Sequence, residues 1–269
     1  MINQITVTNH LSESLTLSLS DPYSTGLVVE SITGLGPPKA SINTSDLAMG
    51  DGAVYNSGRV DKRNIVMRLR LLEVWEDNEV TETIEDVRLK TYKYFPLNKP
   101  ITLTIETENR TVWTEGYVES NDPDVFSKDE TASISIICPR PFFYGAEVTE
   151  TTFPITYDGE YDCGVLLDIM CSGPVNTPVI RNVTNDDSIT INRTFKNTDH
   201  ILISSVLGDT YINFTTYGDP TPVNLMNYVP KLDSWVHLTR GTNNITASAT
   251  SGANKLSVSV KYTPLYGGV

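Results

Sequence analysis

The sequence predicts a mainly β protein, because apolar and polar residues alternate along most of the chain while helical spacing is nearly absent. Alternation of this kind places one face of a strand against a core and the other face in water. The 269 residues are 39% hydrophobic and 20% charged, which suits one or two globular domains. The alternation is clearest at Leu15, Leu17 and Leu19, at Ile101, Leu103 and Ile105, at Ala132, Ile134 and Ile136, and over 187–194, 200–206, 210–215 and 254–262.

One segment departs from this pattern and predicts a helix over residues 82–95. Ile84, Val87, Thr91 and Tyr94 recur at helical spacing, and the segment stops before a proline. Acidic residues come at its start and basic residues toward its end, which is the order that the helix dipole favours.

Two domains follow from the strand pattern and from a break near residue 145. Residues 98–120 predict two strands joined by a polar turn, and 131–138 predict a third. The run "PRPFFYG" at 139–145 continues neither a strand nor a helix. We therefore expect domains over 1–145 and 146–269, the second being a β-sandwich because short strands alternate there with turn signals.

Residues 34–63 have little hydrophobic period of their own. Connections longer than roughly 12–15 residues are uncommon inside compact domains and are usually functional or disordered. Leu47, Met49, Val54 and Tyr55 are dispersed through the segment, which favours an extended arm or hairpin over a flexible linker. We expect such an arm to pack on a neighbouring copy of the chain.

The charge distribution argues against a protein that grips nucleic acid. The formal net charge is −13 and the sequence pI is about 4.6, whereas phosphate binding relies on clustered Lys and Arg. The densest cluster of positive charge comprises Arg59, Lys62, Arg63, Arg68 and Arg70. This cluster could meet an acidic surface on another subunit, or it could be a solvated face beside local carboxylates.

Three cysteines, Cys138, Cys163 and Cys171, are too few and too irregularly spaced for a disulfide framework or a zinc site. We expect them to be reduced and buried. The sequence shows neither a signal-peptide pattern nor an apolar run long enough to cross a bilayer, so we expect folding in a cytoplasm without membrane insertion.

Five segments in order resemble the successive signatures of phage distal tail proteins. They are "SITGLGPP", "DGAVYNSGRVDKRNIVMRLRLL", "IEDVRLKTYKYFPLNKPITLTI", "CPRPFFYG" and "GTNNI" before "LSVSVKYTPLYGGV". The resemblance implies an N-terminal tail-tube-like β-sandwich or barrel with one helix and a long hairpin arm, followed by a galectin-like β-sandwich.

The resemblance also implies a function and partners. Family members form a homohexameric ring at the distal end of the virion tail, between the tail tube protein and the hub or tip protein. The ring leaves an axial channel for DNA in transit, and the C-terminal domain can carry a receptor-binding protein. Assembly would take place in the host cytoplasm. The candidate inter-subunit arm residues are Asp51, Tyr55, Arg59, Lys62 and Arg63.

The sequence offers no catalytic, cofactor or metal site, so we expect a protein that is not an enzyme. His10, His200 and His237 are isolated, and no nucleophile elbow or phosphate loop is present. The adjacent pair Asp186 and Asp187 falls in a predicted turn, where acidic residues are ordinary.

The alternative function is a carbohydrate-binding module that recognises host surface glycans. Trp235 could stack on a sugar, with His237, Arg240 and Asn243 as polar neighbours. Packing of Trp235 in the sandwich core is the favoured interpretation, because the resemblance implies an aromatic residue packed in the sandwich at this position. A galectin-like fold also does not by itself carry sugar binding. A tail-tube protein is a third option, although it would not need so large a second domain. Trp75 and Trp113 are expected to be core or interface anchors.

Overall fold

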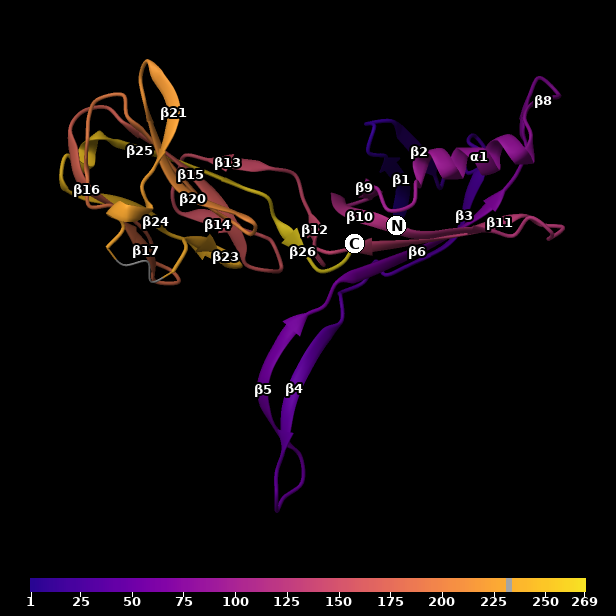
Figure 1. Cartoon of the computed structure of the whole chain (residues 1–269), viewed down its shortest axis with the longest axis horizontal. Helices are drawn as coiled ribbons and strands as arrows, with labels where there is room; N and C mark the ends of the chain where they lie inside the picture. Colours follow the sequence, from indigo (N-terminus) through magenta and orange to yellow (C-terminus); the bar gives the residue numbers. More distant parts are fainter. Residues whose placement is uncertain (231–233) are drawn as a thin grey trace. The chain divides into compact units, whose positions relative to one another are not determined.

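The structure is a computed structural model that describes residues 1–230 and 234–269, and it is mainly β, as the sequence predicts (Figure 1). The chain divides into two compact units. The first comprises Met1–Gly145 together with Tyr266–Val269, and the second comprises Ala146–Leu265. The last four residues thus belong with the first unit, whereas the sequence placed everything after residue 145 in the second domain.

The first unit is built on one antiparallel sheet in the order β2-β1-β9-β10-β11-β6-β3. β12 pairs with β10 and with β26, the strand at which the chain re-enters this unit. The bounds are β1 (Ile2–Thr8), β2 (Ser14–Ser18), β3 (Leu27–Thr33), β6 (Arg63–Leu71), β9 (Pro100–Thr107), β10 (Thr111–Pro123), β11 (Thr131–Cys138), β12 (Phe143–Tyr144) and β26 (Leu265–Tyr266).

The alternation along these strands creates the core of the first unit. Every second residue of β6 and β11 is buried, so one face of the sheet is apolar and the other carries mostly Ser, Thr and charged residues. The helix α1 (Ile84–Tyr94) contributes Val87 to the core. Thr83 caps it, and Thr83 and Asp86 form a reciprocal capping box. The helix predicted over 82–95 is confirmed.

Two hairpins of the first unit lie outside its main sheet. One is β4 (Ala40–Asp46) with β5 (Ala53–Val60), drawn as a separate two-stranded ribbon in Figure 1. The other is β7 (Val74–Glu76) with β8 (Glu79–Glu82), whose turn residues Asp77 and Asn78 both have positive φ, as a tight hairpin turn requires.

The second unit contains two main antiparallel sheets and one further strand pair. One sheet has the order β13-β25-β15-β19-β20-β21, with β22 paired to β15; the other joins β17, β16 and β18, with β24 paired to β16. β14 pairs with β23. The bounds are β13 (Val148–Glu150), β14 (Ile155–Tyr157), β15 (Cys163–Cys171), β16 (Val175–Asn182), β17 (Asp187–Thr190), β18 (Thr194–Phe195), β19 (His200–Val206), β20 (Asp209–Thr216), β21 (Asp219–Asn224), η1 (Met226–Tyr228), β22 (His237–Leu238), β23 (Gly241–Asn243), β24 (Ile245–Ser251), η2 (Ala253–Lys255) and β25 (Leu256–Tyr262).

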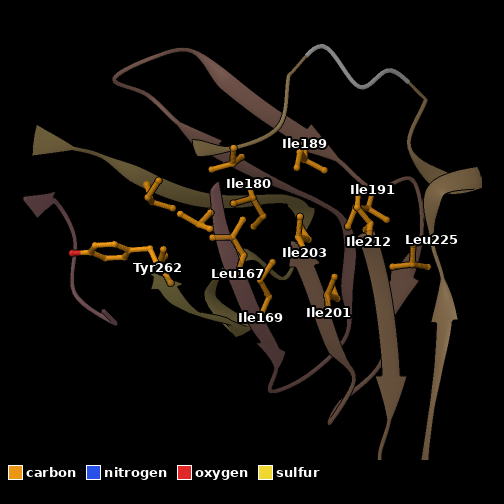
Figure 2. Close-up of a cluster of buried hydrophobic side chains, with 14 of the residues drawn as sticks. Leu167, Ile169, Ile180, Ile189, Ile191, Ile201, Ile203, Ile212, Leu225 and Tyr262 are labelled. Carbon is orange, nitrogen blue, oxygen red and sulfur yellow. The ribbon is translucent and has the colours of Figure 1, made fainter. Parts of the chain in front are cut away.

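The core of the second unit lies between its two main sheets. Leu167 and Ile203 come from one sheet and Ile180 and Ile189 from the other, and all four are buried. Figure 2 shows these side chains pointing toward one another. Because alternate residues of each strand face inward, the outward-facing residues of the same strands remain available for other contacts.

The cysteines are free and buried, as expected from their spacing. Burial raises the pKa of the Cys163 and Cys171 thiols to about 11, and it also raises the pKa of Cys138. A raised thiol pKa keeps the sulfur protonated at neutral pH, and the thiolate is the reactive form. All three thiols are therefore chemically inert in the folded chain.

This inertness predicts the outcome of thiol labelling. At pH 8, iodoacetamide should leave all three cysteines of the native protein unmodified, because each side chain is buried and each thiol stays protonated. In guanidinium chloride all three should be alkylated, as counted by intact-protein mass spectrometry. Modification of any of them in the native protein at a rate close to that of the unfolded chain would contradict the assigned burial.

Candidate assembly surface and its root

The hairpin β4–β5, which we call the arm, exposes apolar side chains that contact little else. All residues of β4 and all of β5 except Val60 are exposed. Ile42 is 59% exposed and Tyr55 63% exposed, and the Met49 side chain at the tip is fully exposed. Ile42 and the Tyr55 hydroxyl both lie beside Gly58, where an added Cβ would come within 3.2 Å of each. The arm therefore presents a small apolar cluster to solvent.

The structure places four of the five predicted arm residues on or beside this exposed hairpin. Asp51 lies in its tip and Tyr55 on β5, while Arg59 is 84% exposed and lies 3.6 Å from Asp61. Lys62 follows β5 and is exposed as well. The hairpin occupies 40–60, which is shorter than the 34–63 expected from the sequence.

Arg63, the fifth predicted arm residue, corrects that expectation, because it is only 3% exposed and lies at the root of the arm. Its Nη1 donates to the carbonyl oxygens of Gly34 (2.5 Å) and Gly36 (2.7 Å), just before the arm begins. Its Nε donates to the Pro141 oxygen (2.7 Å), and its guanidinium carbon lies 4.2 Å from the centre of the Phe143 ring. Because these guanidinium N–H groups have hydrogen-bond acceptors, the positive charge of Arg63 can be buried without a large desolvation penalty.

The chain's last residues meet the same arginine. Arg63 Nη2 donates to the Gly267 oxygen at 2.5 Å, and the backbone N–H of Val269 donates to the Leu35 oxygen at 3.1 Å. A second arginine, Arg110, stacks over Tyr266 and donates to the oxygen of Gly268. The four C-terminal residues therefore form part of the root of the arm.

Gly34 is required at this root by geometry. Its φ is +82°, and a Cβ there would lie 2.0 Å from the Asn64 carbonyl oxygen. Only glycine tolerates both conditions without a shift of the backbone. This contact places the segment that precedes the arm directly against the segment that follows it.

The remaining basic residues of the predicted cluster are paired locally. Arg68 Nε and Arg70 Nη2 lie 3.2 Å and 2.6 Å from the carboxylate of Glu30. The local-carboxylate interpretation therefore applies to Arg68 and Arg70. Pairs with this degree of exposure contribute at most about 1 kcal/mol each.

The predicted sugar-binding residues do not form a common exposed site. Trp235 packs against the core of the second unit and Arg240 is exposed. Asn243 is completely buried. Its amide donates to the oxygens of Thr239 and Gly241, and its carbonyl accepts from the Thr239 N–H and from Asn182 Nδ2. The Asn243 amide is therefore committed to the chain itself, and its geometry does not support a sugar-binding role.

The sequence predicts that His237 is isolated and that Asp187 is an ordinary turn residue, whereas the structure brings the two together. Asp187 is 3% exposed, and its Oδ2 lies 2.5 Å from His237 Nδ1 and 3.1 Å from the His237 backbone N–H, which donates to it. His237 Nε2 lies 3.9 Å from Asp162. Spacing along the chain concealed this contact, because fifty residues separate the two partners.

The described residues contain neither a membrane-spanning helix nor a metal cluster. Across 1–230 and 234–269, no helix has the length and apolar character needed to cross a bilayer. The same residues include no group of three or more His, Cys, Asp or Glu side chains arranged to hold a metal ion.

Comparisons with known proteins give a consistent result for the second unit and for the fold. Residues 158–266 match the family model described as siphovirus-type tail component, C-terminal domain. The crystal structure of the SPP1 Dit protein, described as a paradigm of the hub adsorption apparatus in phages that infect Gram-positive bacteria, aligns with a TM-score of 0.68. The alignment covers 97% of this chain and 98% of that one at 13% identity.

The resemblance to phage distal tail proteins is confirmed. A chain of the phage P2 baseplate in its activated conformation with Ca is also similar, with a TM-score of 0.50 and 13% identity over 98% of both chains. A comparison with curated proteins gave no match. At 13% identity the similarity to these solved structures shows the fold alone. The roles of individual residues must therefore come from the geometry of this chain.

Two exposed aromatic residues of the first unit gave no clear signal in the sequence. Trp75 is 59% exposed on β7 and Phe126 is 99% exposed between β10 and β11, so neither belongs to the core. Trp113 instead stacks on Tyr144, with ring centres 4.6 Å apart, and donates to the Gly145 oxygen. Alternation identifies which residues share a face of a strand, but it does not tell which face is covered.

The Arg63 contacts predict a large effect for a conservative substitution. Arg63→Lys keeps the charge but loses the planar donor fork and the stacking on Phe143, and leaves carbonyl acceptors unpaired. We expect a loss of about 2–4 kcal/mol in the free energy of unfolding, measured by urea denaturation. The matched control, Arg59→Lys on the exposed arm, should change it by less than about 0.5 kcal/mol. Equal stability of the two variants would show that the contacts at the root contribute little.

The Asn243 contacts predict a second stability difference. Asn243→Ala should destabilise the protein by about 2–3 kcal/mol, because it leaves buried partners without hydrogen bonds. The neighbouring Asn244 is exposed, so Asn244→Ala serves as the control and should be nearly neutral. Thermal unfolding followed by circular dichroism measures both variants. A neutral Asn243→Ala variant would rule out the assigned network.

Proposed function

We propose that this chain is a structural distal tail protein that forms a homohexameric ring between the tail tube and the tail tip of a phage virion. The observation that carries the proposal is the exposed arm, which presents Ile42, Val54 and Tyr55 to solvent. The match of residues 158–266 to a tail-component family and the SPP1 Dit-like fold support it.

In this proposal the arm of each copy lies on the next copy around the ring. Covering a side chain such as Ile42 or Tyr55 removes apolar surface from water, worth roughly 1–2 kcal/mol for each of these partly exposed residues. Contacts from one patch to a different patch generate a ring when the rotation closes. The arm supplies one patch, and the complementary patch lies on the body of the neighbouring subunit.

The charge of the chain suits an axial channel for DNA in transit. A net charge of −13 lets the inner surface carry acidic side chains, which repel a passing polyanion and keep it from adhering. The proposed partners are the tail tube protein on one side and a hub or tip protein on the other, with a receptor-binding protein as a further partner of the second unit. The role is structural rather than enzymatic.

Replacing the arm tests this function. A variant in which residues 40–60 are replaced by a short Gly-Ser turn should remain folded, because the arm contributes no residue to the core of the first unit. The wild-type protein should elute as a species six times the monomer mass by size-exclusion chromatography with light scattering. The variant should elute as a monomer, and negative-stain images should show rings with a central hole for the wild type only.

Two further measurements make the test decisive. Asn244→Ala, at an exposed position of the second unit and away from the arm, serves as a control and should leave the ring intact. A wild-type protein that stays monomeric at high micromolar concentration and shows no ring would contradict the proposal, as would a variant without the arm that still forms sixfold rings.

A further inference from the structure

The second unit contains an open groove that the proposed ring function does not use. It has a volume of about 560 Å³, within the range of roughly 300–1,000 Å³ typical of small-molecule sites. It lies at the edge of one sheet, where β15 and β20 end and β19 and β25 begin. None of the predicted sugar-binding residues lines it.

Two large side chains provide apolar surface in this groove. Met170, at the end of β15, is 50% exposed, and Tyr217, in the turn after β20, is 87% exposed. An exposed aromatic ring beside a flexible thioether forms a surface on which the C–H face of a ligand can stack. The exposed surfaces of both side chains are available to a ligand.

Polar groups surround the apolar surface and remain available for a ligand. The side chains of Asn197, Thr215, Tyr217 and Ser257 make no hydrogen bond to any part of the chain that the structure describes. His200 also lines the groove, and its Nδ1 lies 3.5 Å from a buried oxygen of Asp168.

The walls of the groove are fixed by a buried carboxylate. Asp199 is 5% exposed, and its carboxylate accepts from the Lys196 N–H and from the Thr216 hydroxyl. Its backbone oxygen accepts from the Cys171 N–H, and the Thr198 N–H donates to the Cys171 oxygen. These bonds join the start of β19 to the ends of β15 and β20, so the groove exists before any ligand arrives.

We infer that this groove binds a neutral saccharide ring. A pyranose has an apolar C–H face, suited to Tyr217 and Met170, and a rim of hydroxyl groups, suited to Asn197, Thr215 and Ser257. No lysine or arginine lines the groove among the described residues, which disfavours phosphates and other anions. The abundance of uncommitted hydroxyl and amide groups disfavours a purely apolar ligand.

Saturation-transfer NMR tests the inference directly on the full chain. The probes are methyl glucoside, methyl galactoside and N-acetylglucosamine, for which we expect affinities in the millimolar range, as suits one small site with few hydrogen bonds. Tyr217→Ala should weaken binding of the recognised glycoside about three- to tenfold, because a single stacking contact is lost. Asn197→Ala should weaken it by a similar factor.

Matched controls separate the groove from non-specific effects. Tyr23 is 65% exposed in the first unit, so Tyr23→Ala should leave binding unchanged. Thermal unfolding of Tyr217→Ala should match the wild type, since the ring is almost wholly in solvent. The absence of saturation transfer from every probe overturns the inference, and so does binding that survives in a Tyr217→Ala, Asn197→Ala double variant. A protein that binds anilinonaphthalene sulfonate in the groove but binds none of the three glycosides would also overturn the inference. Each result is independent of ring assembly.

Discussion

The burial of Arg63 is the constraint on which the shape of the first unit depends. An arginine keeps its charge at any physiological pH and carries five N–H donors, so it is stable in the interior only where acceptors surround it. Backbone carbonyls from residues 34, 36, 141 and 267 provide them. One side chain therefore joins the start of the arm, the end of the sheet and the C-terminal residues. The arm can point outward because its root is held from both sides.

The sequence predicts those parts of the fold that depend on residues close to one another in the chain. Strand alternation depends on neighbours two residues apart, and the helix depends on spacing within a few turns, so both are visible without tertiary information. Thr83 and Asp86 mark the beginning of α1 within three residues of each other. The same locality identified the arm, since a long segment without period has no core residues to contribute.

The parts that sequence misplaced depend on contacts between distant residues. Arg63 was grouped with Arg59 because they are close in the chain, whereas its partner at residue 267 is 204 positions away. An asparagine amide can form hydrogen bonds to a sugar, but Asn243 is completely buried and both ends of its amide bond to the chain itself. The groove is assembled from four strand ends, and no short motif contains them. Residue type indicates what chemistry is possible, and burial decides whether it is available.

The exposed apolar surface of the arm gives the proposed ring a source of binding energy. An isolated two-stranded hairpin is only marginally stable in water, so in the proposed assembly β4 and β5 would be stabilised by the neighbouring surface that covers Ile42, Val54 and Tyr55. These three side chains are 51–63% exposed, so covering them is worth roughly 3–5 kcal/mol, while association costs about 4–15 kcal/mol in lost freedom. One such contact therefore offsets only the low end of that cost. In the proposed ring of six, six contacts offset five association steps, so closing the ring adds a contact that an open chain of six copies lacks, without further loss of freedom.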